Sequence, residues 1–188
     1  MTLRNKYIEY NDEEVTLEGY LVWDDKVSHP RPGVLINHAW AGRSSFECDR
    51  ADKIAELGYV AFAIDLYGKG VIGKSKSENS QLMQPFIKDR SFLKRRLLLA
   101  LNVLKNQNYV NSDKIASVGY CFGGLASLDL ARYGLNLKGA VSLHGNLAPL
   151  NHTKSQKIDT KILILHGWKD PMILPGDVLN FTKEMTKS

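Results

Sequence analysis

The segment Gly119-Tyr120-Cys121-Phe122-Gly123-Gly124 constrains the fold more than any other part of the chain. It has the form GxCxGG and follows a short apolar run, a pattern typical of a sharp turn from a buried strand into a helix. A Cβ at Gly119 or Gly123 would collide with neighbouring backbone, and Gly124 lets the helix pack closely. Such a turn raises one side chain above the carboxyl edge of a parallel sheet, so Cys121 is a candidate nucleophile.

Strand and helix patterns alternate along the rest of the chain. Residues 6–10 and 15–23 are strand-like and are separated by a polar turn, which predicts a hairpin. The later strands are expected at residues 34–37, 59–64, 114–118, 137–143 and 161–165, and the helices at 45–57, 85–106, 176–187 and from the elbow to 133. This alternation predicts an α/β fold with a mostly parallel sheet and helices on both faces, in one domain over residues 1–188.

Composition narrows the class of protein. With 188 residues and 44% hydrophobic content, the chain can bury one substantial core. The net charge of +5 is spread over mixed-sign stretches, and the one basic cluster, residues 94–96, lies in an expected helix as a solvated face, so nucleic-acid binding is not expected. No basic-then-apolar leader or long apolar run is present, so we expect neither secretion nor membrane insertion. A cytoplasmic location follows, where a catalytic thiol stays reduced.

Three motifs together resemble the dienelactone hydrolase family, which has the α/β-hydrolase fold and a cysteine nucleophile. They are the elbow at residues 119–124, the segment Gly-Tyr-Val-Ala-Phe-Ala-Ile-Asp-Leu-Tyr-Gly-Lys-Gly at 58–70, and Leu-His-Gly-Trp-Lys-Asp-Pro at 165–171. The resemblance runs from about residue 32 to the end of the chain. It implies a Cys-His-Asp triad that cleaves lactones or esters through an acyl-thioester, with no metal or organic cofactor and with a small-molecule ester or lactone as substrate.

The two cysteines have different sequence contexts. A free thiol is only a few per cent thiolate at neutral pH, so a nucleophilic cysteine needs a neighbouring imidazole or a helix N-terminus. Cys121 lies at the N-terminus of the helix that follows it, where the helix dipole favours the thiolate. Cys48 has no such context, and we expect it to be an unreactive residue that only packs against its neighbours.

Two backbone N–H groups are expected to form an oxyanion hole. One belongs to Phe122, directly after the nucleophile, and the other to Ala39 or Trp40 in the loop after the strand at 34–37. His38 ends that strand, and its position resembles the loop-supporting histidine of the family. Many family members carry a glutamate at the position of Ala39, which offers no charge here, and Glu47 is only a weak substitute.

Asp170 follows the strand at 161–165, where the order of the α/β-hydrolase fold places the triad acid. Its task would be to hold an imidazole in one tautomer and to stabilise the imidazolium. A turn-capping aspartate before Pro171 is the other interpretation. Asp65 also ends a strand, but the matching family motif treats that position as structural.

The triad histidine is the difficulty, because the fold order requires it after Asp170. All five histidines precede the acid, at positions 29, 38, 144, 152 and 166. His144 is a weak stand-in, since the strand that it ends borders the site. We therefore expect the chain to lack the last strand and helix of the fold, with the triad histidine beyond Ser188 or donated by another chain. A catalytically impaired remnant or a ligand-binding pseudo-enzyme is the alternative.

Three further expectations concern ligands and assembly. Arg90 could pair with a substrate carboxylate, although a solvated charge on a helix is the simpler interpretation. Residues 67–79 form either a lid or a surface loop. An uncovered edge of a parallel sheet would favour a homodimer.

Overall fold

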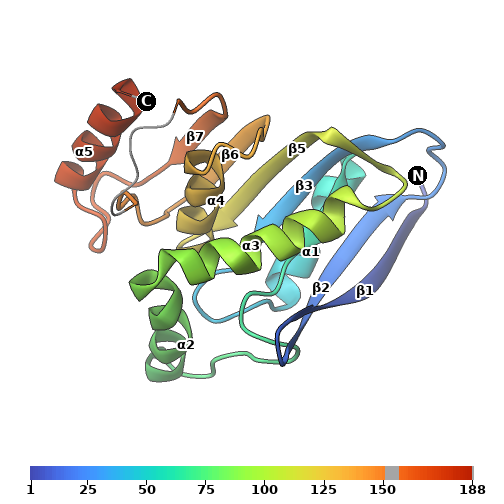
Figure 1. Ribbon diagram of the computed structural model, residues 1–188, viewed down its shortest axis with the longest axis horizontal. Helices are drawn as coiled ribbons and strands as arrows, with labels where there is room; N and C mark the ends of the chain where they lie inside the picture. The colour runs from blue at the N-terminus through green and yellow to red at the C-terminus, as the bar shows by residue number, and fades with distance from the viewer. Residues whose placement is uncertain (151–156, 188) are drawn as a thin grey trace.

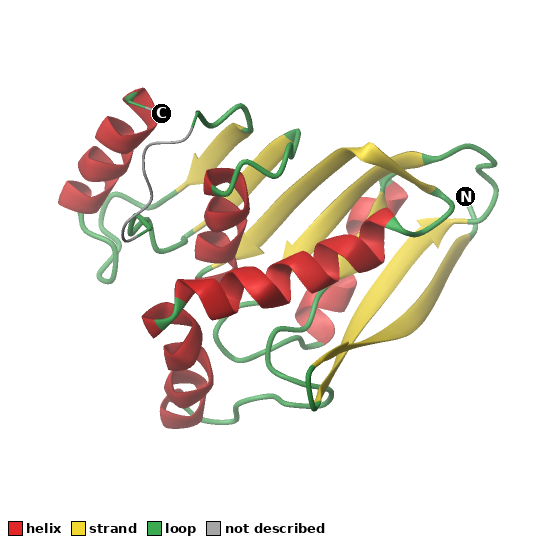
Figure 2. Ribbon diagram, viewed as in Figure 1, coloured by secondary structure: helices red, strands yellow, loops and turns green. Residues whose placement is uncertain are grey.

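The chain folds into a seven-stranded β-sheet with helices on both faces (Figures 1 and 2). This computed structural model describes residues 1–150 and 157–187. The strands are β1 (Leu3–Asp12), β2 (Val15–Asp24), β3 (Arg31–Asn37), β4 (Val60–Ala63), β5 (Val110–Tyr120), β6 (Gly139–Leu143) and β7 (Lys161–Leu165). The α/β class with a mostly parallel sheet, predicted from the alternation of patterns, is confirmed.

The strand order is β1-β2-β4-β3-β5-β6-β7, and the direction of pairing changes once along it. β1 and β2 form the predicted antiparallel hairpin, and β2 is also antiparallel to β4. From β4 through β7 all pairs are parallel. Because parallel strands end at the same edge, the residues after β3, β4, β5, β6 and β7 gather along one side of the sheet.

Helices cover the two faces unequally. They are α1 (Ser45–Glu56), α2 (Lys76–Lys88), α3 (Arg90–Lys105), α4 (Phe122–Arg132) and α5 (Pro175–Thr186). α1 packs on β2, β3 and β4, whereas α3 and α4 lie on the opposite face, as Figure 1 shows. α2 leaves the sheet and packs against α3.

The core is divided between these faces. The larger cluster, which includes Phe62, Leu97 and Leu125, lies under α3 and α4. The smaller one joins Ile36 of β3 to Ala51 and Ala55 of α1, whose small side chains let this helix approach the sheet closely.

The prediction of one long helix at residues 85–106 is wrong, because this segment is divided between α2 and α3. Asp89 takes an extended conformation between them, with φ −120° and ψ 94°, and its side chain accepts hydrogen bonds from the backbone N–H groups of Ser91 and Phe92. Its carboxylate therefore caps the N-terminus of α3 and fixes the break. α2 also begins inside the segment that was expected to be a loop, so residues 76–79 are helical.

β7 lies at the edge of the sheet and is less covered than the central strands. Its inner side packs through Ile162 and Ile164 into a small cluster with Phe181 of α5. On its other side, the side chains of Leu163 and Leu165 are 51% and 48% exposed. These two side chains form an apolar stripe along an edge strand, so this strand is a candidate contact surface.

Candidate active site

Cys121 lies in a strained turn between β5 and α4. Its φ is +54° and its ψ −112°, a conformation that an L-residue adopts only where the surroundings impose it. An added Cβ on Gly119 would lie far closer than 3.0 Å to the carbonyl of Gly123, and one on Gly123 would meet the carbonyl of Asn37. The GxCxGG spacing therefore produces the elbow through direct backbone contact.

The Cys121 thiol is partly buried and has no cationic partner among the described residues. Burial raises its pKa, the backbone N–H of Phe122 lowers it, and the negative charge of Asp170 raises it further. The position of Cys121 at a helix N-terminus predicts a larger thiolate fraction. In the structure the balance favours the protonated thiol.

Asp170 and His144 meet across the ends of β7 and β6. A hydrogen bond joins Nδ1 of His144 to Oδ2 of Asp170, and the backbone N–H groups of Met172 and Ile173 donate to Oδ1. The N–H of Met172 is the main cause of a lowered pKa of this carboxyl, and His144 adds to it. Asp170 therefore stays ionised and both caps a turn and holds an imidazole.

His144 adopts a strained backbone conformation of its own, with φ +54°, and its side chain is about half exposed. Within the described part of the chain, no hydrogen bond connects its ring to the thiol of Cys121. The imidazole that contacts the acid is therefore not hydrogen-bonded to the resting nucleophile.

The other histidines have different surroundings. His38 is fully buried: its Nδ1 donates to the carbonyl of Ala39 and its Nε2 accepts from the N–H of Leu66. Burial lowers its pKa, so it stays neutral and ties the loop after β3 to the end of β4. Nε2 of His166 contacts the carbonyl of Ile173. His29 is exposed, and His152 lies outside the described residues.

The two expected candidates for the second oxyanion donor differ in availability. The N–H of Ala39 points to Oε1 of Glu47, at 3.4 Å, while the N–H of Trp40 has no partner among the residues that the structure describes. The carbonyl of Ala39 accepts from both His38 and the N–H of Gly42. Since N–H and C=O point in opposite directions in a trans peptide, these two bonds fix the direction of the Trp40 N–H.

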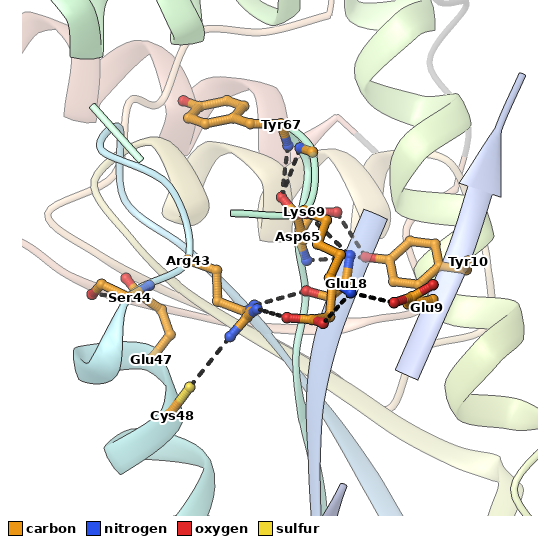
Figure 3. A network of polar contacts seen from close by, with 11 residues as sticks. Glu9, Tyr10, Glu18, Arg43, Ser44, Glu47, Cys48, Asp65, Tyr67 and Lys69 are labelled. Atoms are coloured by element: carbon orange, nitrogen blue, oxygen red, sulfur yellow. Dashed lines mark hydrogen bonds and ion pairs between the residues drawn. The ribbon is translucent and has the colours of Figure 1, made fainter. Parts of the chain in front are cut away.

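A polar network fixes the loops after β3 and β4 to β2 (Figure 3). Arg43 donates through Nε to the carbonyl of Glu18 and through Nη2 to its carboxylate, at 2.7 and 2.9 Å. Asp65 accepts from the N–H groups of Glu18, Tyr67 and Gly68. Asp65 therefore has structural contacts, and the oxyanion loop is held at both of its ends.

Glu47 and Cys48 also contribute to this region rather than to the chemistry. The carboxylate of Glu47 caps α1 by accepting from the N–H and hydroxyl of Ser44, and it is 2% exposed. None of these hydrogen bonds joins Glu47 to the Cys121 thiol. Cys48 lies 3.6 Å from Nη1 of Arg43 on a separate cavity of about 350 Å³, and burial raises the pKa of its thiol.

A cavity of about 200 Å³ lies over Cys121. Its lining comes from loops after the strands and from α2: Trp40, Met83, Gln84, Ile87, Cys121, Phe122, His144, Asn146, Met172 and Ile173. Cys121, His144 and the oxyanion loop thus share one small space, and Asp170 is joined to it through His144.

The contribution of α2 to the cavity differs from the expectation of a lid or surface loop at residues 67–79. A signal was available: Ser75 accepts from the N–H of Glu78, three residues on, as the Ser-x-x-Glu pattern of a helix start predicts. The connecting loop is anchored rather than free. The hydroxyl of Tyr67 donates to the carbonyl of Trp40, and the N–H of Gly73 donates to the carbonyl of Ala41.

Arg90 does not line this cavity, in contrast to its expected role toward a substrate carboxylate. Its guanidinium pairs with the fully buried carboxylate of Asp129, with Nε–Oδ2 and Nη2–Oδ1 distances of 2.6 and 2.5 Å. Arg132 contacts the same carboxylate at 3.3 Å and also binds Glu184 of α5. These ion pairs fasten α3, α4 and α5 together.

Neither a metal site nor a membrane helix was found in residues 1–150 and 157–187. No group of three His, Cys, Asp or Glu side chains there is placed to hold a metal ion. No helix of that part is long and apolar enough to span a membrane.

Comparison with known proteins identifies similar sequences. Residues 17–188 match the family model of the dienelactone hydrolase family. A protein of Aquifex aeolicus, named "Putative carboxymethylenebutenolidase", is 26% identical over 186 residues, which are 96% of this chain and 78% of that protein. An uncharacterised protein of Caenorhabditis elegans is 38% identical over 95 residues, half of this chain, and the match spans 60% of the worm protein.

Solved structures are similar over nearly the whole chain. A protein titled m3DLH superimposes with a TM-score of 0.94 at 30% identity, covering 99% of this chain and 78% of its own. A dienelactone hydrolase-like promiscuous phosphotriesterase from metagenomic libraries gives a TM-score of 0.93 at 31% identity, covering 99% and 77%. The described fold is therefore shared by longer proteins.

Proposed function

Because the chain belongs to the dienelactone hydrolase family, we propose that it hydrolyses carboxylic esters or lactones through an acyl-thioester on Cys121. The observation that supports this most directly is the strained elbow, which holds Cys121 against a small cavity with the backbone N–H of Phe122 beside its sulfur. A cysteine fixed in this way and an acid at the end of β7 are two parts of the arrangement that acyl transfer uses, and the base is the third.

The first step forms the thioester. The sulfur of the Cys121 thiolate attacks the ester carbonyl carbon, and the carbonyl electron pair moves onto oxygen. The N–H groups of Phe122 and Trp40 are the proposed donors to this oxyanion. When the tetrahedral intermediate collapses, the C–O bond to the alcohol breaks and the acyl group stays on sulfur. The alcohol leaves with the proton that the base has taken from the thiol.

The second step consumes water. A base removes a proton from a water molecule, whose oxygen attacks the thioester carbonyl and releases the carboxylic acid and the thiolate. Asp170 is the proposed orienting acid for the imidazole that serves as base. We propose that this imidazole belongs to a histidine outside residues 1–188, because His144 precedes the acid in the chain and has no hydrogen bond to Cys121.

Burst kinetics with p-nitrophenyl acetate test this proposal on the 188-residue chain. Its leaving group needs no proton, so we expect one equivalent of p-nitrophenolate per chain, followed by slow turnover. Cys121→Ala should abolish the burst, and Cys48→Ala should keep it. Free imidazole should increase the steady-state turnover of the chain about tenfold relative to turnover without imidazole. Both rates are corrected for the background measured with Cys121→Ala.

Two outcomes would contradict parts of the proposal. Rapid turnover that His144→Gln abolishes would show that His144 is the base. The absence of any burst from a folded chain would favour the alternative function, in which the cavity binds a ligand without turning it over.

A further inference from the structure

We infer that the cavity over Cys121 selects uncharged esters with an apolar acyl group and disfavours esters that carry a carboxylate. This inference rests on the proposed function at Cys121 and adds the substrate class. It is drawn from the chemistry of the cavity wall and from the positions of the neighbouring charges.

The wall of the cavity is mostly apolar. Met83 and Ile87 lie four residues apart on α2 and therefore point to the same side of this helix. Trp40, Met172 and Ile173 come from the loops after β3 and β7. Two of these side chains are methionines, whose flexible thioethers adapt to acyl groups of different shape.

The polar part of the lining carries no fixed positive charge. Gln84 and Asn146 contribute neutral amides, and no lysine or arginine lines the cavity among the residues that the structure describes. The negative charge of Asp170 raises the pKa of the Cys121 thiol, so the field at the sulfur includes a negative contribution. A substrate carboxylate would therefore lose water without gaining an ion pair to a lysine or arginine. It would also be repelled by Asp170, whose carboxylate already holds the imidazole of His144 in the cavity wall.

The arginines of the neighbouring elements are committed elsewhere. Arg90 is held by both oxygens of Asp129, and Arg43 is held by Glu18. Freeing Arg90 would remove one of the two arginine partners of the fully buried carboxylate of Asp129, which is unfavourable. Although the chain has a positive net charge, these arginines are therefore not available to pair with a substrate in this cavity.

A matched pair of activated esters tests the inference. Both p-nitrophenyl pentanoate and mono-p-nitrophenyl glutarate carry five acyl carbons, but the glutarate ends in a carboxylate. We expect the second-order rate constant for acylation of Cys121, corrected with the Cys121→Ala variant, to be at least about tenfold larger for the pentanoate. Equal rates, or a faster glutarate, would overturn the inference and leave the proposed function intact. If neither ester acylated Cys121, the proposed function itself would fail.

Two arginine variants on α2 test the electrostatic cause. Gln84→Arg places a cation in the cavity and should reduce the preference for pentanoate over glutarate at least about threefold. Gln81→Arg adds the same charge one turn earlier, outside this cavity, and should leave the preference unchanged. Equal preferences in both variants and in the unaltered chain would contradict the assigned cause.

Discussion

The two sides of the sheet differ in how firmly they hold their part of the site. β3, β4 and β5 are enclosed by helices, and the nucleophile and oxyanion loop at their ends are fixed by buried hydrogen bonds. β6 and β7 carry His144 and Asp170, yet β7 exposes apolar side chains and is fastened through α5. The comparison indicates that the acylating half of the site is rigid, whereas the imidazole and the acid depend on a thinly covered edge.

The largest expected effect comes from the rigid side. A Cβ on Gly123 would fall on the backbone carbonyls of Asn37 and His38, which cannot move without shifting β3. We expect Gly123→Ala to lower the free energy of unfolding by about 4 kcal/mol or more in urea denaturation. In Gly167→Ala the new methyl group meets nothing within 4 Å, so the change should stay within about 0.5 kcal/mol. Similar values for both variants would show that the elbow is not under steric constraint.

The next effect concerns the fastening of the edge. Arg132, whose side chain is 3% exposed, joins Asp129, Glu184 and the carbonyls of Leu147 and Ala148. Arg132→Ala should cost about 3 kcal/mol in unfolding free energy, because the buried carboxylate of Asp129 loses one of its two arginine partners and the buried carbonyl of Leu147 loses this donor. Amide exchange should accelerate first in β7 and α5.

An exposed arginine provides the control for that variant. Arg4 pairs with Asp25 on the surface of the hairpin, where both side chains are at least half exposed. Arg4→Ala should change stability by less than about 1 kcal/mol. Uniform acceleration of exchange across the whole sheet in Arg132→Ala would contradict the view that this arginine fastens one side.

A smaller effect is expected on association. We propose that the exposed side of β7 lets the 188-residue chain pair with a second copy, since Leu163 and Leu165 present an apolar stripe along an edge strand. Leu163→Lys should therefore shift the population toward monomer in sedimentation velocity at equal protein concentration. A Lys161→Gln control changes a charge on the same strand without removing an apolar side chain. A monodisperse monomer from the unaltered chain would contradict this proposal.

The smallest effect is on the reactivity of the thiol. Since burial and Asp170 raise the pKa of Cys121, its alkylation by iodoacetamide should accelerate with pH through and beyond the ordinary range of a cysteine near 8.5. Asp170→Asn removes the negative charge, which lowers this pKa and should increase the rate at pH 7 about two- to threefold. Asp113→Asn, far from the site on β5, should have no effect. An unchanged rate in Asp170→Asn would show that its charge does not reach the sulfur.

The sequence predicted the strands and the elbow well because their signals are local. Gly119 and Gly123 lie where a Cβ would clash with neighbouring backbone, and this glycine spacing is visible in the sequence. Short apolar runs likewise indicate strands that are buried on both faces. The break at Asp89 was missed, because a capping aspartate inside a helix-like apolar pattern reads as an ordinary solvated residue. The partners of Arg90 and of His144 could not be predicted, since they depend on which side chains the topology brings together over 39 and 26 residues.

The most direct test of the account is the site of acylation in the unaltered chain. After a short incubation with p-nitrophenyl acetate at neutral pH and acid quenching, intact-protein and peptide mass spectrometry would locate the acetyl group. The account predicts a mass increase of one acetyl group, on the peptide that contains Cys121, with Cys48 unmodified. Acetylation of Cys48 or of surface lysines, with Cys121 free, would contradict the claim that the elbow holds the nucleophile.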